Sequence, residues 1–487
     1  MAWSRRAVLA GFLASAAAPA FAEAPAVSLL PRRRGDGSAE RSTPTSAESL
    51  IAGAELGGAV GFVVADARTG TILEAVEPSR QLPPASVMKA LTAAYALDRM
   101  GPARGFTTRV LATGPVSGGV VQGDLVLAGG GDPALDTDML GDLAARLRAA
   151  GVTGATGDYL IWDAALPRMD RIDDEQPDFV GYNPAIGGLN LNFNRVHFEW
   201  RKRGGDWNLT MDARAERFTP AVRMARVRVA QRETPLFTFE QKGSTEDWTV
   251  ASAALGKGGA RWLPVRHPGL YTAEVFQTLC AAQGIKLPAP RFVDTLPQGT
   301  ELARNDSAPL DILLRDMLKH STNLTAEVMG LSASQAATHL GSVTAMREWA
   351  RIRHGIAPRI ADHSGLGGAS RISAVEMVKV LTDTHQGGLP ALLKLHPMQD
   401  SKGKPVKDHP VQIRAKTGTL NFVSALAGYV QPPGGRQMAF AIFAADPERR
   451  ARLTLAERED PPGGDAWNRR ARTLQGNLLA RWAQLYA

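Results

Sequence analysis

The sequence has a single cysteine, Cys280, among its 487 residues. No intramolecular disulfide can form, which excludes a disulfide-stapled scaffold and leaves the packed core to stabilise the fold. The nine histidines are scattered, and neither a His-Glu-x-x-His pattern nor a Cys/His cluster occurs. The sequence therefore predicts no metal ligands and no cofactor.

Long apolar runs are also missing, since none reaches the roughly 20 residues that span a bilayer. Residues 1–22 combine a basic start at Arg5 and Arg6, a short apolar run over 7–18 and a small-x-small site at Ala20-Phe21-Ala22. This arrangement is typical of a secretory signal peptide, and the paired arginines also resemble a twin-arginine export signal. We expect an exported protein with no stable membrane span.

The chain lacks runs of Lys and Arg interleaved with aromatic residues, so we expect no nucleic-acid partner. Its formal net charge of +8 is diffuse and suits a polyanionic surface such as a cell wall. With 44% hydrophobic and 21% charged residues, the composition is that of a globular protein long enough for two or more domains.

Segments that predict strands occur near both ends of the chain. Two lie at 59–65 and 71–75, and three lie at 411–416, 423–430 and 438–443. We expect them to pair in one antiparallel sheet that both ends of the chain build. Helical periodicity predicts helices that flank this sheet, over 84–100, 310–318, 341–354, 373–385 and 474–485.

The middle of the chain, residues 106–294, has short alternating segments separated by Gly-rich turns and predicts a strand-rich insertion. The fold class that follows is α+β, with an insertion that forms one or two extra domains. The predicted organisation is a signal peptide (1–22), a flexible lead-in (23–48), a main domain in two segments (49–105 and 295–487) and the insertion (106–294), which we expect to contain two nested subdomains.

The first stretch that could carry chemistry lies at the start of the helix predicted over 84–100. Ser86 and Lys89 are three residues apart, so a helix places both side chains on one face. A helix N-terminus stabilises an oxyanion, and a lysine whose pKa is lowered by burial or by another cation can act as a base. Ser-x-x-Lys is expected about once by chance in a chain of this length. A second copy, Ser401 to Lys404, lies in a polar loop and is predicted to be solvated surface.

Two further patterns occur once each, Ser-x-Asn at 321–323 and Lys-Thr-Gly at 416–418. Alone, Ser321 is more simply a helix cap, Asn323 a turn residue and Lys-Thr-Gly a strand end. Their order and setting are more specific. Serine and lysine lie on a helix, Ser-x-Asn on a connection between helices, and Lys-Thr-Gly on a strand.

Together the three patterns resemble the penicillin-recognising serine enzymes, whose β-lactamase-like fold has an antiparallel sheet flanked by helices. Ser86 and Ser321 lie 235 positions apart (321 − 86), and this long insertion resembles the S13 family of D-alanyl-D-alanine carboxypeptidases and endopeptidases, the penicillin-binding-protein-4 type. The resemblance runs from about Ser49 to the C-terminus. Further similar stretches lie at 127–133, 189–194, 267–271, 362–366 and 415–430.

The resemblance implies a role for each residue of the first two patterns. Ser86 is expected to form the acyl-enzyme and Lys89 to take its proton. Ser321 is expected to relay a proton to the leaving amine, and Asn323 to hold the acyl-side amide of the substrate.

The third pattern is expected to bind the terminal carboxylate of the substrate. The resemblance implies that Lys416 supplies positive potential, that Thr417 and Thr419 donate hydrogen bonds, and that Gly418 belongs to the same substrate-binding strand. It also implies an oxyanion hole formed by the backbone N–H groups of Ser86 and Thr419.

The implied partners are peptidoglycan stem peptides and β-lactams, which would acylate the enzyme in the periplasm. Two other hypotheses stay open. One is a β-lactamase or esterase of the same superfamily, which the long insertion disfavours. The other is a catalytically idle cell-wall-binding module, which the presence of all three patterns disfavours.

The sequence departs from the family pattern at two places. The middle residue of Ser-x-Asn is Thr322 where aspartate is common, and residues 367–369 separate Leu366 from Ser370-Arg371, which usually follows directly. The wall of the cleft is therefore expected to differ from that of the family.

Overall fold

The computed structural model describes residues 44–399 and 404–486. The predicted signal peptide, most of the predicted lead-in and Ser401 lie outside these described residues. Within the two described ranges, no helix is both long enough and apolar enough to cross a membrane.

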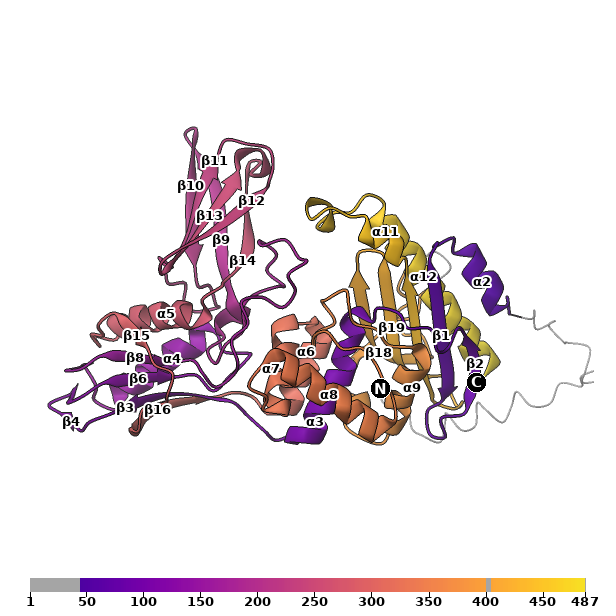
Figure 1. Ribbon diagram of the computed structural model, residues 1–487, viewed down its shortest axis with the longest axis horizontal. Helices are drawn as coiled ribbons and strands as arrows, with labels where there is room; N and C mark the ends of the chain where they lie inside the picture. The colour runs from indigo at the N-terminus through magenta and orange to yellow at the C-terminus, as the bar shows by residue number, and fades with distance from the viewer. Residues whose placement is uncertain (1–43, 400–403, 487) are drawn as a thin grey trace, which may run out of the picture. The chain divides into compact units, whose positions relative to one another are not determined.

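The sheet predicted from both ends of the chain is present, with the strand order β17-β18-β19-β20-β1-β2 and antiparallel pairs throughout (Figure 1). Both of its faces are apolar, because in β1 Phe62 and Val64 face one helical layer while Val63 and Ala65 face the other. The strands are β1 (Ala59–Asp66), β2 (Ile72–Val76), β17 (Lys394–Leu395), β18 (Gln412–Leu420), β19 (Val423–Gln431) and β20 (Met438–Ala445).

Helices cover both faces of this sheet. Helices α2 and α12 pack on one face, where Trp467 and Trp482 are buried, and α3 and α6 to α9 pack on the other. The predicted helices are confirmed, although the first begins with a 3-10 turn, η1. The bounds are α2 (Ala47–Gly53), η1 (Ala85–Val87), α3 (Met88–Met100), α6 (Leu310–His320), α7 (Asn323–Ser334), α8 (His339–His354), α9 (Ala374–Asp383), α10 (Leu389–Leu392), α11 (Pro447–Ala451), η4 (Ala456–Arg458) and α12 (Gly464–Leu485).

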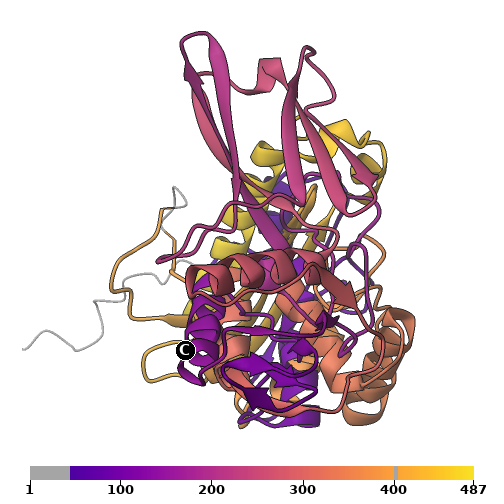
Figure 2. The ribbon, with the colours of Figure 1, turned by 90° about the vertical axis from the view of Figure 1, so that its left-hand side faces the viewer.

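Segments between Thr107 and Asp306 form four further sheets. The largest has the order β15-β8-β6-β3-β16, and α4 and α5 lie side by side against it (Figures 1 and 2). Strand β16 pairs with β3, so residues beyond the predicted boundary at 294 belong to the same sheet. Its elements are β3 (Thr107–Ala112), β6 (Leu125–Ala128), α4 (Thr137–Ala149), β8 (Tyr159–Trp162), α5 (Pro268–Ala282), β15 (Pro290–Phe292) and β16 (Thr300–Asp306).

The three smaller sheets of this region have the orders β10-β9-β14, β11-β13-β12 and β4-β5-β7. The strand-rich character predicted for the middle of the chain is therefore present. Their elements are β4 (Val116–Ser117), β5 (Val120–Val121), β7 (Gly154–Ala155), η2 (Leu191–Asn194), β9 (Arg195–Arg203), β10 (Asp206–Asp212), β11 (Ala225–Ala230), β12 (Phe237–Lys242), β13 (Thr245–Ala251), η3 (Ser252–Ala254) and β14 (Gly258–Pro264).

Candidate active site

Ser86 lies in η1, the single 3-10 turn that precedes α3. Ala85 adopts a left-handed φ of 46°, and the Val87 N–H donates to the Pro84 carbonyl at 3.1 Å. Such a conformation is costly for a residue with a Cβ, and strain of this kind gathers at functional sites. The turn leaves Ser86 half-buried at the N-terminal end of a helix, where unpaired N–H groups and the helix dipole stabilise negative charge.

Lys89 lies one turn further along and is fully buried. Its Nζ donates to Ser86 Oγ at 2.9 Å, to Asn323 Oδ1 at 2.7 Å and to the Ser364 carbonyl oxygen at 2.7 Å. The structure therefore brings the predicted nucleophile and the predicted base into direct contact.

Burial lowers the pKa of Lys89 to about 7, although the carboxylates of Asp362 and Glu327 act to raise it. An ordinary lysine remains an ammonium near neutral pH, whereas Lys89 loses its proton there. The neutral amine is then within hydrogen-bond reach of the Ser86 hydroxyl, as a general base must be.

The Ser-x-Asn pattern forms the short connection between α6 and α7. Ser321 follows α6 with a left-handed φ of 60°, and Asn323 is the first residue of α7. The Asn323 Nδ2 donates to the Tyr182 carbonyl at 2.9 Å, while its Oδ1 accepts from Lys89. Asn323 is thus fixed between the amine and a loop from the middle of the chain.

Lys416 lies in β18 and is almost fully buried. Its Nζ donates to Ser321 Oγ at 2.9 Å and to the Thr417 carbonyl at 2.6 Å. Burial lowers the pKa of Lys416 well below its usual value, and the charges of Lys89 and Lys394 lower it further. A carboxylate that binds nearby would raise this pKa again and favour the ammonium form.

The other residues of β18 differ in their positions. Gly418 packs against the Ser86 turn, because an added Cβ would lie 2.7 Å from the Pro84 carbonyl oxygen and 3.0 Å from the Ser86 nitrogen. Thr419 lines the cleft beside Ser86, whereas Thr417 is exposed and is not among the lining residues.

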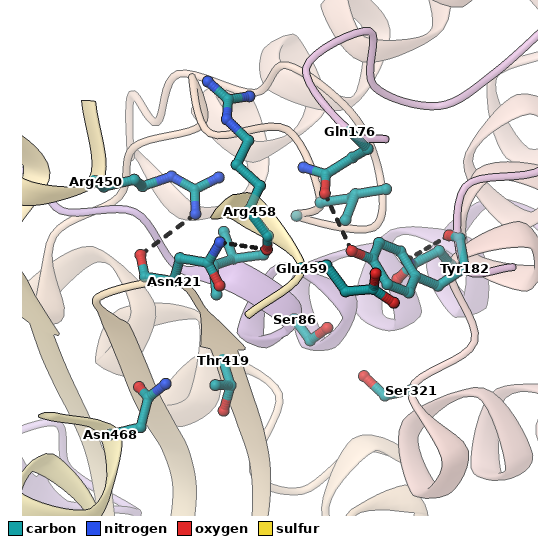
Figure 3. A pocket seen from close by; sticks show the side chains of 14 residues that line it. Ser86, Gln176, Tyr182, Ser321, Thr419, Asn421, Arg450, Arg458, Glu459 and Asn468 are labelled. Atoms are coloured by element: carbon teal, nitrogen blue, oxygen red, sulfur yellow. Dashed lines mark hydrogen bonds between the residues drawn. The ribbon is translucent and has the colours of Figure 1, made fainter. Parts of the chain in front are cut away.

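Ser86, Ser321, Asn323 and Thr419 line a common cleft of about 270 Å³ (Figure 3). Gln176 and Tyr182 reach it from the middle of the chain, and Arg450 and Arg458 from the segment after β20. None of the four was predicted from the sequence, because they carry no local pattern. The cleft is lined by Ser86, Gln176, Tyr182, Ser321, Asn323, Gly365, Leu366, Thr419, Leu420, Asn421, Arg450, Arg458, Glu459 and Asn468.

Hydrogen bonds between the lining residues shape the far wall of the cleft. Arg450 Nη1 donates to the Asn421 carbonyl at 3.3 Å, and Asn421 Nδ2 donates to the Arg458 carbonyl at 2.7 Å. The Tyr182 hydroxyl donates to Gln176 Oε1 at 3.2 Å (Figure 3). The first two contacts join residues 29 and 37 positions apart, and the third lies within one loop.

One cluster near Lys89 has side chains of the type that bind metals. Ligand atoms of Glu327, His339 and His363 lie within 4.8 Å of one another. The two ring nitrogens of His363 already lie 2.8 Å from Ser342 Oγ and 3.1 Å from Met346 Sδ, and the Glu327 oxygens accept two backbone N–H groups. These atoms are thus engaged in hydrogen bonds, and we assign the cluster to the support of the site.

Comparisons with known proteins identify the family to which the chain is similar. The model of the D-Ala-D-Ala carboxypeptidase 3 (S13) family matches residues 45–460. A D-alanyl-D-alanine carboxypeptidase from Actinomadura sp. (strain R39) is 28% identical over 448 residues, which cover 81% of this chain and 79% of that protein. The D-alanyl-D-alanine carboxypeptidase DacB of Haemophilus influenzae is 24% identical over 416 residues, which cover 80% of this chain and 85% of that protein.

The fold is also that of a solved structure. Penicillin binding protein 4 (dacB) from Haemophilus influenzae superposes with a TM-score of 0.66 and 21% identity, covering 82% of this chain and 93% of that chain. The same protein complexed with a β-lactam gives a TM-score of 0.68. The predicted fold class, a penicillin-recognising serine enzyme fold with extra domains, is confirmed.

Proposed function

The chain belongs to the S13 family of D-Ala-D-Ala carboxypeptidases, which are serine hydrolases, and we propose that it releases the terminal D-alanine of peptidoglycan stem peptides through an acyl-enzyme on Ser86. The observation that carries this proposal is the convergence of two serine–lysine pairs on one cleft. Ser86 contacts Lys89 at 2.9 Å, Ser321 contacts Lys416 at 2.9 Å, and Asn323 contacts Lys89.

Acylation starts from the neutral amine of Lys89. Lys89 takes the proton of the Ser86 hydroxyl while Oγ attacks the carbonyl carbon of the penultimate D-alanine. The backbone N–H groups of Ser86 and Thr419 receive the oxyanion. The C–N bond to the terminal D-alanine then breaks. Ser321, hydrogen-bonded to Lys416, relays to the leaving amine the proton that Lys89 took from Ser86, so that Lys89 is neutral again. Water hydrolyses the resulting ester, which yields the shortened peptide and restores the Ser86 hydroxyl.

The exposed edge of β18 offers a place for the substrate backbone. Strand β17 pairs only with Arg414 and Ala415, so β17 does not cover the edge from Lys416 onward. A peptide added along this edge gains main-chain hydrogen bonds, while Asn323 holds its acyl-side amide. Lys416 and Thr419 are then placed to bind the terminal carboxylate.

The same groups could cleave a cross-link between two stem peptides, because only the leaving group differs. We therefore include DD-endopeptidase activity in the proposal. Penicillins carry a strained amide that Ser86 would open to give an ester, so they are proposed as acylating inhibitors. The proposed location is the periplasm, where such peptides occur.

The test is to incubate the purified mature chain with a peptide that ends in D-Ala-D-Ala and with a cross-linked dimer of stem peptides. Release of D-alanine supports carboxypeptidase activity, and cleavage of the dimer supports endopeptidase activity. Rapid turnover of penicillin without either product would favour a β-lactamase instead. Binding to cell-wall sacculi without any hydrolysis would favour an idle binding module.

A further inference from the structure

Glu327 is a buried carboxylate one turn into α7, below Asn323. The two residues are four positions apart on one helix, so their side chains share a face. Glu327 is 0% exposed. A carboxylate without solvent needs strong partners, and the partners of Glu327 lead directly to the proposed catalytic base.

The carboxylate holds the backbone of the segment that follows Asp362. Its Oε1 accepts from the Ser364 N–H at 2.9 Å, and its Oε2 accepts from the His363 N–H at 3.1 Å. His339 Nε2 lies 3.3 Å from the same Oε2. Burial acts to raise the pKa of Glu327, but the hydrogen bond from His339 and other nearby partners lower it below the usual range, so Glu327 is ionised.

The carbonyl that faces Lys89 is that of Ser364, in the next peptide group. The N–H of that group, from Gly365, donates to Asp362 Oδ1, so Glu327 and Asp362 hold this backbone together. The Ser364 carbonyl oxygen lies 2.7 Å from Lys89 Nζ, as does Asn323 Oδ1. A neutral lysine has two N–H donors and one lone pair. When the Ser364 carbonyl and Asn323 take both donors, the lone pair is directed at the remaining neighbour, Ser86 Oγ.

We propose that Glu327 is a positioning residue for the reaction, because its hydrogen bonds to the His363 and Ser364 N–H groups help to fix the Ser364 carbonyl, which turns the lone pair of Lys89 toward Ser86. This inference rests on the proposed function. It assigns Glu327 to the machinery although its side chain has no direct contact with Ser86 in the described structure.

Five charged or titratable groups surround Lys89 from the neighbouring elements. Asp362 in the loop and Glu327 in α7 raise the pKa of Lys89, and Lys416 approaches from β18. His339 from α8 and His363 lie beyond Glu327. Removing the charge of Glu327 should lower the pKa of Lys89, so the amine should become neutral at lower pH.

The test compares three variants by the second-order rate of acylation with a fluorescent penicillin between pH 5 and pH 9. E327Q removes the charge and one acceptor, so we expect an acylation rate at least about tenfold lower at the plateau and an acid limb about one pH unit lower. E327D keeps the charge but is too short to hold both N–H groups, so its rate should fall while the acid limb stays. E376Q is the matched control, because Glu376 also accepts backbone N–H groups, from Ala357 and Ser373, but does not face Lys89.

A fourth variant, H339Q, keeps the effect of charge on Lys89 testable if E327Q fails to fold. Burial opposes protonation of His339, but the hydrogen bond and charge of Glu327 raise its pKa, so that wherever the ring is protonated its charge offsets that of the carboxylate. H339Q should expose Lys89 to the full charge of Glu327 and move the acid limb to higher pH. An E327Q chain with the wild-type rate and acid limb, or one that only melts earlier, would overturn the inference. A wild-type chain that forms no adduct at any pH would instead overturn the proposed function and this inference with it.

Discussion

In the proposed mechanism, the protonation state of Lys89 decides when Ser86 can attack. Burial lowers the pKa of Lys89 to about 7, and only the neutral amine can take a proton. Below that pH the ammonium form predominates, so the acylation rate should fall about tenfold per pH unit. We expect an acid limb near pH 7 in the pH profile of penicillin acylation. An acid limb near the value of an ordinary lysine would contradict this assignment.

Lys416 is expected to act on peptides through the terminal carboxylate and the leaving amine. The K416M variant should lower kcat/KM for a D-Ala-D-Ala peptide by about 10²-fold, because it removes both the charge and the hydrogen bond to Ser321. K394Q is the control, since Lys394 is an exposed residue that affects Lys416 only through its charge. In steady-state assays, K394Q should have a kcat/KM close to that of the wild type. An equal loss of kcat/KM in K416M and K394Q would instead indicate a general effect of charge.

The sequence predicts the residues with short-range patterns and misses those without them. The pair of Ser86 and Lys89 could be predicted, because a helix places residues three apart on one face. Tyr182 contacts Asn323 across 141 positions, and Glu327 looks like any glutamate on a helix. Contacts of this kind follow from tertiary packing, which a single sequence does not encode in a local pattern.

At the scale of the secondary-structure elements, β18 packs tightly against the Ser86 turn at Gly418. An alanine at this position would place its Cβ 2.7 Å from a backbone carbonyl oxygen, which has no flexible side chain to yield. The G418A variant should push β18 away from the Ser86 turn and slow acylation about 10²-fold. Its free energy of unfolding should fall by about 1–3 kcal/mol.

Gly53 in α2 provides the control for this substitution. No atom lies within 4 Å of a Cβ added there, and its φ is not positive. G53A should therefore keep the wild-type acylation rate and be at least as stable in a chemical denaturation experiment. An unchanged acylation rate in G418A would show that contact between β18 and the turn is not needed.

The elements also show which patterns a sequence reveals. The strands of the main sheet were predictable, because apolar residues cluster in short runs bounded by turn residues. Helix α5 was not predicted and lies within the region predicted to be rich in strands. Its buried residues, among them Tyr271, Thr272, Ala273, Val275 and Phe276, surround much of the helix and leave no single apolar stripe.

In the whole molecule, the middle of the chain contributes directly to the cleft. The loop over 163–190 carries Tyr182, whose carbonyl accepts from Asn323. Arg266 is 4% exposed and donates to three carbonyl oxygens of this loop, those of Asp170, Asp178 and Asn183. The domain boundaries stay a prediction, but these contacts connect the long middle segment to Asn323 and the cleft.

The R266Q variant should loosen the loop that carries Tyr182. Lost hydrogen bonds from a buried guanidinium should lower the free energy of unfolding by about 2–4 kcal/mol. Because Asn323 is proposed to hold the substrate amide, KM for the peptide should rise more than kcat falls. R291Q is the control, since Arg291 pairs with Asp158 at an exposed position. This substitution should change neither the free energy of unfolding nor KM much. A wild-type KM in R266Q would separate the loop from substrate binding.

We propose that a single serine, Ser86, forms the acyl-enzyme. The most direct measurement is mass spectrometry of the penicillin-treated chain, followed by peptide mapping of the adduct. In the wild-type chain, one penicillin should be found on the peptide that contains Ser86. A folded S86A chain should carry none. The S401A chain, which alters the second Ser-x-x-Lys copy, should carry as much as the wild type. An adduct that persists in S86A, or that maps to another serine, would contradict the account.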